Sequence, residues 1–426
     1  MRKRSSQEMR SHNQALLINL IRERGPVSRA DLVRLTSLSP TTVSTIVGRL
    51  IRQGLILEES STARRGGAGR PAIKLRLNPK YGQVIGVDLG VSRIVVALAD
   101  LQGQLLARVE SPTPREAETG KTVSACVTTI LMLIEKLPVG RLLGVGMGLP
   151  GLVDTASGVS LVSPNLGFRN VPFGELLHRA LRVPVFLENV IHVTTLGEKW
   201  FGAGVDVDDM ICLGVGSGIG AGVVVDGRLY RGPLDSAGEI GHSPIPQICA
   251  AEPLIPVGER CACGRTGCLE TVSSGPAIAR AAARAAASGK SQVLAGRLAE
   301  QGSRFSAADV TWAAEAGDPI ARQILSEAGT YLGLAVATLV NVFGIGTVVA
   351  GGGVFGAGRW IWEPMVRAAR AHVFSVAPET LQIRPRALGS DASLVGAVSL
   401  ALQHLVFEFP EQEVVASCVR STTDNY

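Results

Sequence analysis

The sequence predicts an α/β protein in three parts: a winged helix-turn-helix module over residues 1–80, a two-lobed layered body over residues 81–405, and a C-terminal tail over residues 406–426. Charge separates the first two parts: residues 1–80 hold 16 Lys and Arg against 5 Asp and Glu, a net of +11, whereas the rest of the chain carries a net of −5. Hydrophobic residues make up 46% of the 426 residues, which excludes wholesale disorder. Apolar segments of the body end in glycine-rich turns and alternate with helical patterns, which is typical of layered α/β folds.

Composition excludes several other classes of protein. The sequence has no stretch of about 18 uncharged apolar residues, so we expect no membrane span. The basic N-terminus is not followed by the apolar region of a secretory signal. Seven cysteines is an odd number, and three of them fall within Cys261–Cys268, which indicates metal binding in a reducing compartment. We therefore predict a cytoplasmic protein.

Helix caps and breakers divide the first 80 residues. Ser28 and Ser39 each precede a segment with helical periodicity, where Ser is a favoured N-cap, and Pro40 suits a first helical position. Gly25 and Pro26 end the preceding helix. The predicted elements are a helix at Asn13–Arg24, a helix from Ser28 to Thr36, a helix from Ser39 to Gly54, and strands at Leu55–Leu57 and Lys74–Leu77.

The third of these helices has the character of a DNA-recognition helix. Its inner face is apolar, and the other faces carry short hydroxyl groups and an arginine, which fit a major groove. The wing, Thr62–Pro71, is basic and glycine-rich, as expected of a loop that follows phosphates or a minor groove. Two alternatives stay open: a solubilising Arg-rich arm, and a three-helix protein-binding module. The predicted DNA contacts are Thr41, Thr42, Ser44, Thr45 and Arg49 of the helix and Arg64, Arg65 and Arg70 of the wing.

Three glycine clusters in the body each follow an apolar strand. Glycine lets backbone N–H groups approach phosphate oxygens, although glycines also serve tight turns. In this order and spacing the clusters resemble the nucleotide cradle of the sugar-kinase/actin-type, ribonuclease H-like fold. That resemblance places Asp88 at the metal–phosphate position. The candidate nucleotide-binding residues are Asp88, Gly90, Gly216, Gly218, Gly220, Gly351 and Gly352.

A metal site is predicted from four residues. Cys261, Cys263 and Cys268 lie within eight residues, and His242 precedes Cys261 by 19 positions. Three thiolates and one imidazole make a closed tetrahedral Zn²⁺ site, which is a structural rather than a catalytic arrangement. Such a zinc ion would order an otherwise irregular loop. The alternative is three free thiols and an unrelated histidine.

These motifs together resemble the ROK family (repressors, open reading frames and kinases), and in particular its sugar-responsive repressors that carry an N-terminal winged helix. The resemblance spans roughly residues 12–403. It implies that Asn189, Glu239, His242 and Glu270 contact sugar hydroxyls between the lobes, while His242 also holds zinc with the three cysteines. A lone Glu is ordinarily a surface charge, which is the alternative for Glu239 and Glu270. The segments that carry the resemblance are Gly148–Asp154, Glu188-Asn189, Gly214–His242 and Cys261–Glu270.

Departures from the family pattern bear on catalysis. In the family's kinases an Asp follows Glu-Asn and accepts the proton of the attacking hydroxyl; here that position is Val190, which cannot accept a proton. His192 stands where the family usually has Asn, and Asp88–Ser92 lacks a glycine and the Thr-Lys end of the phosphate motif. Phe343–Ile345 lacks the usual Asp-Pro. We therefore expect no kinase activity and only a vestigial nucleotide site.

The predicted function is that of a nucleoid-associated transcriptional regulator, a repressor of sugar uptake or catabolism genes. A sugar effector would close the lobes and lower the affinity for a double-stranded DNA operator. A homodimer or a dimer of dimers suits this role because two recognition helices must match two half-sites. One alternative is an active sugar kinase with a DNA-binding arm. Another is a ligand-independent regulator controlled by a protein partner.

Overall fold

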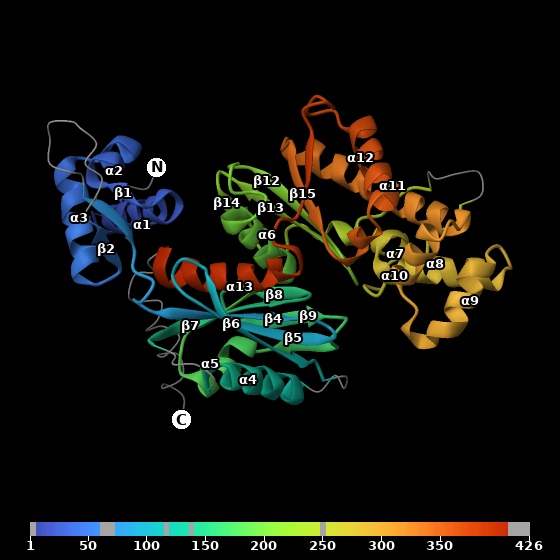
Figure 1. The fold of residues 1–426 in the computed structure, drawn as a ribbon, viewed down its shortest axis with the longest axis horizontal. Coiled ribbons are helices and arrows are strands. Elements are labelled where there is room, and N and C mark those ends of the chain that lie inside the picture. Colours follow the sequence, from blue (N-terminus) through green and yellow to red (C-terminus); the bar gives the residue numbers. More distant parts are fainter. Residues whose placement is uncertain (1–5, 60–72, 115–118, 136–139, 248–252, 408–426) are drawn as a thin grey trace.

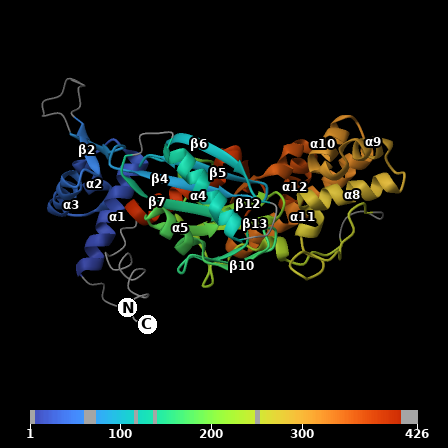
Figure 2. The ribbon, with the colours of Figure 1, turned by 90° about the horizontal axis from the view of Figure 1, so that it is seen from below.

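The computed structural model describes residues 6–59, 73–114, 119–135, 140–247 and 253–407. Three parts follow one another along the long axis of the molecule: the N-terminal module, a first lobe and a second lobe (Figures 1 and 2). A helical N-terminal module with a small sheet, followed by a two-lobed α/β body, is the arrangement that the sequence predicts.

The N-terminal module consists of three helices and a small antiparallel sheet. Its sheet has the order β1-β3-β2. The Ser28 hydroxyl accepts a hydrogen bond from the backbone N–H of Asp31, whose carboxylate accepts one in return from the N–H of Ser28, so the second helix begins with a capping box. Strand β1 was not expected, because two residues are too few to form a sequence pattern. The elements are α1 (Ser6–Arg24), β1 (Val27–Ser28), α2 (Arg29–Thr36), α3 (Pro40–Arg52), β2 (Ile56–Glu59) and β3 (Lys74–Leu77).

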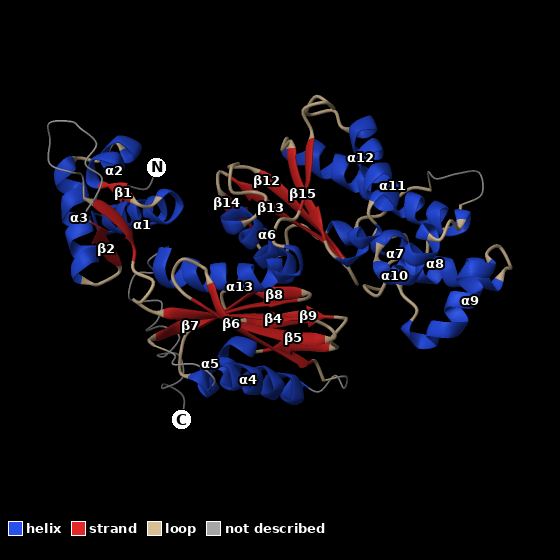
Figure 3. Cartoon of the chain, in the orientation of Figure 1, coloured by secondary structure: helices blue, strands red, loops and turns tan. Residues whose placement is uncertain are grey.

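The first lobe is a five-stranded mixed sheet with the order β11-β7-β4-β5-β6. Helices α4 and α5 cover one of its faces (Figure 3). A separate three-stranded sheet, β10-β9-β8, lies beside it. The elements are β4 (Gln83–Leu89), β5 (Arg93–Ala99), β6 (Leu105–Pro112), α4 (Thr119–Glu135), β7 (Leu142–Leu149), β8 (Leu152–Asp154), β9 (Val159–Ser163), β10 (Phe168–Val171), α5 (Phe173–Leu181) and β11 (Val185–Asn189).

The second lobe is built on another five-stranded sheet, with the order β14-β13-β12-β15-β16. The longest helix, α11, is apolar and mostly buried among its neighbours, as expected of a core helix. The elements are β12 (Met210–Val215), β13 (Ile219–Val225), β14 (Arg228–Tyr230), α7 (Glu270–Ser273), α8 (Gly275–Ala287), α9 (Gln292–Gln301), α10 (Ala307–Glu315), α11 (Pro319–Phe343), β15 (Thr347–Gly351), α12 (Arg359–His372) and β16 (Gln382–Pro385).

Two helices, α6 (Val190–Phe201) and α13 (Ala392–Leu402), lie between the two sheets (Figure 1). They cross in backbone contact: a Cβ on Gly197 would lie 2.6 Å from the carbonyl oxygen of Ala392, and one on Gly396 would lie 1.7 Å from that of Val193. Helix α13 presses equally closely on the first sheet, since a Cβ on Gly146 would lie 2.0 Å from the carbonyl oxygen of Ala397. These contacts leave the two helices little room to move independently.

The N-terminal module shares a hydrophobic core with the body. Leu17, Ile18 and Ile21 of α1 pack in one buried cluster with residues of α13 and of the final turn, Gln403–Phe407. Phe407 is buried there, so ordered structure extends slightly beyond the expected start of the tail at residue 406. The module is thus attached by packing as well as by its linker.

Candidate functional site

Helix α3 presents a small, polar outer face. Its N-terminus forms as predicted: Ser39 caps it, and Pro40 is its first residue. The buried residues Val43, Ile46, Val47 and Leu50 form its inner stripe. Thr41, Ser44, Thr45 and Arg49 are exposed.

Two of the predicted DNA contacts are partly engaged within the module. The hydroxyl of Thr42 lies 2.8 Å from that of Ser39 at the helix N-terminus. Arg49 donates a hydrogen bond to the side chain of Gln14 in α1. The predicted wing contacts Arg64, Arg65 and Arg70 lie outside the described residues, so their placement stays a prediction.

A cavity of about 820 Å³ lies between the lobes. The predicted sugar contacts Asn189, Glu239, His242 and Glu270 all line it, together with Val190. The predicted nucleotide-binding residues Gly216, Gly218, Gly220, Gly351 and Gly352 line it as well. The fold thus brings segments more than 150 residues apart in the chain to one cavity.

Helix α6 begins at this cavity. Asn189 is its N-cap: the side-chain oxygen accepts a hydrogen bond from the N–H of Ile191 at 2.7 Å, and the side-chain nitrogen donates one to the carbonyl of Gly151 at 2.7 Å. Val190, the first residue of the helix, therefore takes the position next to a rigidly held amide. No carboxylate stands at position 190 to accept a proton.

His192 lies on the first turn of α6 and is nearly fully buried. Its Nδ1 lies 3.0 Å from a carboxylate oxygen of Glu188, and its Nε2 lies 2.9 Å from the carbonyl oxygen of Ala237. Both neighbours are hydrogen-bond acceptors, so the surroundings favour the protonated ring, which can donate at both nitrogens. Burial lowers the pKa of His192, but the bond to Glu188 outweighs this and raises it overall.

The same carboxylate also pairs with Arg231, whose Nε lies 2.5 Å from Glu188. Burial would raise the pKa of Glu188, yet the contacts with His192 and Arg231 hold it below its ordinary value. A second bond between the lobes lies nearby, where Asp235 accepts hydrogen bonds from the backbone N–H and the hydroxyl of Thr155 at 3.0 and 2.7 Å. Together these bonds fix the segment that leads to Glu239 against the first lobe.

Glu239 and Glu270 are held beside the predicted metal ligands. An oxygen of Glu239 lies 3.8 Å from Nε2 of His242, and burial raises the pKa of the Glu239 carboxyl. Glu270 accepts a hydrogen bond from the N–H of Ile219 at 3.0 Å, which connects it to the second glycine cluster. Neither carboxylate is an isolated surface charge.

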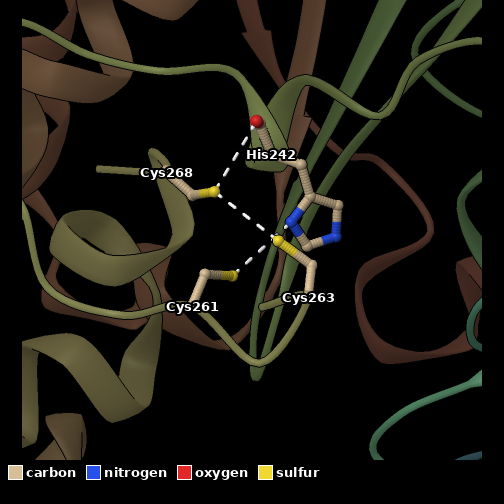
Figure 4. A group of neighbouring side chains, drawn as sticks. All are labelled: His242, Cys261, Cys263 and Cys268. Atoms are coloured by element: carbon tan, nitrogen blue, oxygen red, sulfur yellow. Dashed lines mark hydrogen bonds between the residues drawn. The ribbon is translucent and has the colours of Figure 1, made fainter. Parts of the chain in front are cut away.

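His242, Cys261, Cys263 and Cys268 point toward one another (Figure 4), and their ligand atoms all lie within 4.8 Å of each other. Nδ1 of His242 lies 3.6 Å from Sγ of Cys261, and Sγ of Cys263 lies 3.8 Å from Sγ of Cys268. Ligands at bond lengths of about 2.1 Å (N) and 2.3 Å (S) around a tetrahedral zinc ion are separated by roughly 3.6–3.8 Å. These four residues therefore fit a tetrahedral metal ion.

The first phosphate motif is altered in the fold as well as in the sequence. Asp88 is half-buried, and the hydroxyl of Ser393 in α13 donates a hydrogen bond to it at 2.6 Å. Burial raises the pKa of this carboxyl. On the opposite lobe, the stem of Arg386 fills the space beside Gly351, where a Cβ would lie 2.4 Å from Cδ of the arginine. Asp88 is thus hydrogen-bonded within the first lobe, and Arg386 lies against the third glycine cluster.

Sequence reasoning missed the residues that join the N-terminal module to α6. The guanidinium carbon of Arg22 lies 4.1 Å from the ring centre of Trp200 and 5.4 Å from that of Phe407. Trp200 belongs to the last turn of α6. No local sequence pattern predicts such a contact. The one available signal was Trp200 itself, a large aromatic residue near the end of a helix that starts at the predicted sugar site.

The chain is similar to known proteins along most of its length. A model of the MarR family matches residues 11–66, which include α2 and α3. The chain is 28% identical over 402 residues to a protein named xylose repressor from Caldicellulosiruptor bescii, covering 94% of this chain and 97% of that one. It is 32% identical over 326 residues to a glucokinase from Halalkalibacterium halodurans, covering 75% and 94%.

A solved structure described as a ROK family transcriptional regulator, a homologue of the E. coli MLC protein, resembles this one with a TM-score of 0.79. It shares 29% identity and covers 92% of this chain and 96% of that chain. A model of the ROK family matches residues 84–404, most of the chain. The protein therefore belongs to the ROK family.

Proposed function

We propose that this protein is a DNA-binding transcriptional repressor that a sugar releases from its operator, and that its kinase-like body binds without catalysing. One observation carries the proposal: helix α6 begins in the cleft, directly after its N-cap Asn189, and its last turn places Trp200 against Arg22 of the N-terminal module. A helix of 12 residues spans about 18 Å. It offers a rigid connection between a sugar site and a DNA-binding module.

Three polar side chains line the proposed sugar site in the cleft. Glu239 and Glu270 offer carboxylate oxygens, which accept hydrogen bonds from sugar hydroxyls, and Asn189 offers an amide. His242 lines the same cavity, so the metal loop would also position a sugar contact. A concave site with a few fixed polar groups is typical of small-ligand binding.

Catalysis is opposed on both sides of the cleft. Val190 stands where a kinase of this family has its base, and such a base contributes roughly 10²–10⁴-fold to the rate. Asp88 is engaged with Ser393 instead of facing a metal-bound phosphate. We therefore propose that sugar binding is followed by conformational change and not by phosphoryl transfer.

Close contacts of α6 and α13 would couple sugar binding to the N-terminal module. Ile191 and Thr195 of α6 press on glycines of the second sheet; a Cβ on Gly222, for example, would lie 2.0 Å from the hydroxyl of Thr195. A sugar that closes the lobes thus shifts α6, and α13 follows because Gly197 and Gly396 hold the helices in contact. Both helices then displace α1, through Trp200 and through the shared core.

The four-residue cluster around His242 would hold a structural Zn²⁺, in support of the loop that carries Glu270. A homodimer is proposed because operator half-sites about one helical turn apart require two recognition helices. The protein would act in the cytoplasm, on the nucleoid.

The test measures DNA binding and ATP turnover on the same full-length protein. An operator is first selected from a random duplex pool, and its affinity is then measured with and without D-xylose, D-glucose and further aldoses. We expect one sugar to weaken operator binding and none to cause ATP turnover. Sugar-dependent ATP turnover would favour the alternative of an active kinase. Operator binding that no sugar alters would favour control by a protein partner.

A further inference from the structure

Glycine is an unfavourable residue inside a helix because it exposes the backbone and loses the most conformational freedom on folding. Several mid-helix glycines of this chain have a visible reason. A Cβ on Gly329 would lie 2.4 Å from the carbonyl oxygen of Ile361, and one on Gly333 would lie 2.4 Å from that of Met365. At these positions another helix passes too close for any side chain.

Gly48, in the middle of α3, has no such neighbour. Apart from its own helix backbone and its chain neighbours, the heavy atom nearest to an added Cβ is Nη1 of Arg52 at 3.6 Å, an ordinary contact with the end of a flexible side chain. The backbone at Gly48 is helical, so alanine would fit without strain. Packing within the described residues therefore does not account for glycine at this position.

The position of Gly48 points outward. It follows Ser44 by four residues and Thr45 by three, so Gly48, itself half-buried, lies on the same outer side of α3 as these exposed residues, opposite the buried stripe. That face belongs to the helix proposed to enter the major groove. A position without a side chain there lets a base-pair edge or a sugar–phosphate chain reach the helix backbone.

We propose that Gly48 is the point of closest approach between the recognition helix and operator DNA, and that it determines specificity by having no side chain. The inference rests on the proposed role of α3 in reading DNA. Alanine at this position should improve the helix and impair the complex, so the two effects have opposite signs.

The experiment compares the full-length Gly48→Ala variant with the natural chain, on an operator selected from a random duplex pool. Amide hydrogen exchange within α3 should become about two- to fivefold slower, since alanine favours the helix. Operator affinity should fall at least tenfold, while affinity for unrelated duplex DNA changes less than threefold. The larger Gly48→Leu should weaken operator binding further.

Gly296 supplies the matched control. It lies inside α9, is exposed, and has no heavy atom within 4 Å of an added Cβ. Gly296→Ala should slow exchange in its own helix and leave operator affinity unchanged.

Ser44→Asp separates the two levels of the argument, because a carboxylate on this face would repel phosphates. If Ser44→Asp abolishes operator binding while Gly48→Ala leaves it intact, the inference about Gly48 is wrong and the role of α3 stands. If neither variant affects binding, or if no sequence is enriched from the pool, both are wrong.

Discussion

Removing the aromatic ring of Trp200 tests the proposed path from cleft to DNA. The side chain of Arg22 is 9% exposed, and its guanidinium carbon lies 4.1 Å from the Trp200 ring centre. A desolvated cation–π contact of this kind contributes about 2 kcal/mol. Allosteric coupling free energies are typically about 1–3 kcal/mol, so this single contact is comparable with the whole coupling. Trp200→Leu should therefore abolish most of the effect of sugar on operator affinity.

Fluorescence anisotropy of a labelled operator, measured with and without saturating sugar, gives the coupling directly. Trp200→Phe keeps an aromatic ring over Arg22 and should keep most of the sugar effect. Trp312→Leu is the matched control, because Arg297 lies 4.9 Å from the Trp312 ring centre but that pair is in the second lobe. If Trp200→Leu keeps the natural fold-change on sugar addition, the proposed path through α6 is refuted.

Three further predictions concern the metal, the cleft and the wing. Cys263→Ser should lower the bound zinc from one per chain to well below one in elemental analysis, and should lower the thermal midpoint of unfolding in calorimetry. The control Cys126→Ser changes a buried cysteine outside the cluster and should leave one zinc bound per chain. Val190→Asp should tighten sugar binding by roughly 10- to 150-fold in isothermal titration, since a hydrogen bond to a charged group contributes about 1.5–3 kcal/mol. ATP turnover should nevertheless stay absent in this variant, because Asp88 remains hydrogen-bonded to Ser393. Arg70→Ala should weaken binding to all duplexes and reduce the salt slope by about 0.9 for each phosphate that the arginine neutralises; an unchanged slope would remove Arg70 from the interface.

Local signals account for the parts of the fold that the sequence predicted. Ser28 and Ser39 act on backbone groups within three residues, so the starts of α2 and α3 could be assigned without knowing what packs against them. The three cysteines of the metal cluster fall in an equally short segment, and only His242 had to be brought from further away. In both cases the chemistry depends on residue type and short spacing.

Contacts between distant segments could not be predicted in this way. Helices α6 and α13 are separated by almost 200 residues, and their glycines give no sign in the sequence that they face each other. Arg22 is one of 16 basic residues in the first 80, and nothing in the sequence distinguishes it from the others. Its burial against Trp200 and Phe407 depends on the turn Gln403–Phe407 packing against α1.

The two substitutions on the first turn of α6 have a joint physical consequence. In the family's kinases this turn carries a carboxylate that acts on the substrate; here Val190 is apolar, and the titratable group on the turn is His192, whose pKa the bond to Glu188 raises despite burial. Both ring nitrogens of His192 are engaged, one with Glu188 and one with the carbonyl of Ala237, so this side chain stabilises the arrangement of the lobes rather than a reacting group. A sugar that enters the cleft meets no proton acceptor at position 190, and it binds against a helix that is fastened at its first turn to one lobe's strand and the other lobe's loop. In the proposed mechanism its binding free energy acts on the position of α6 and, through Trp200 and the core shared with α13, on the N-terminal module.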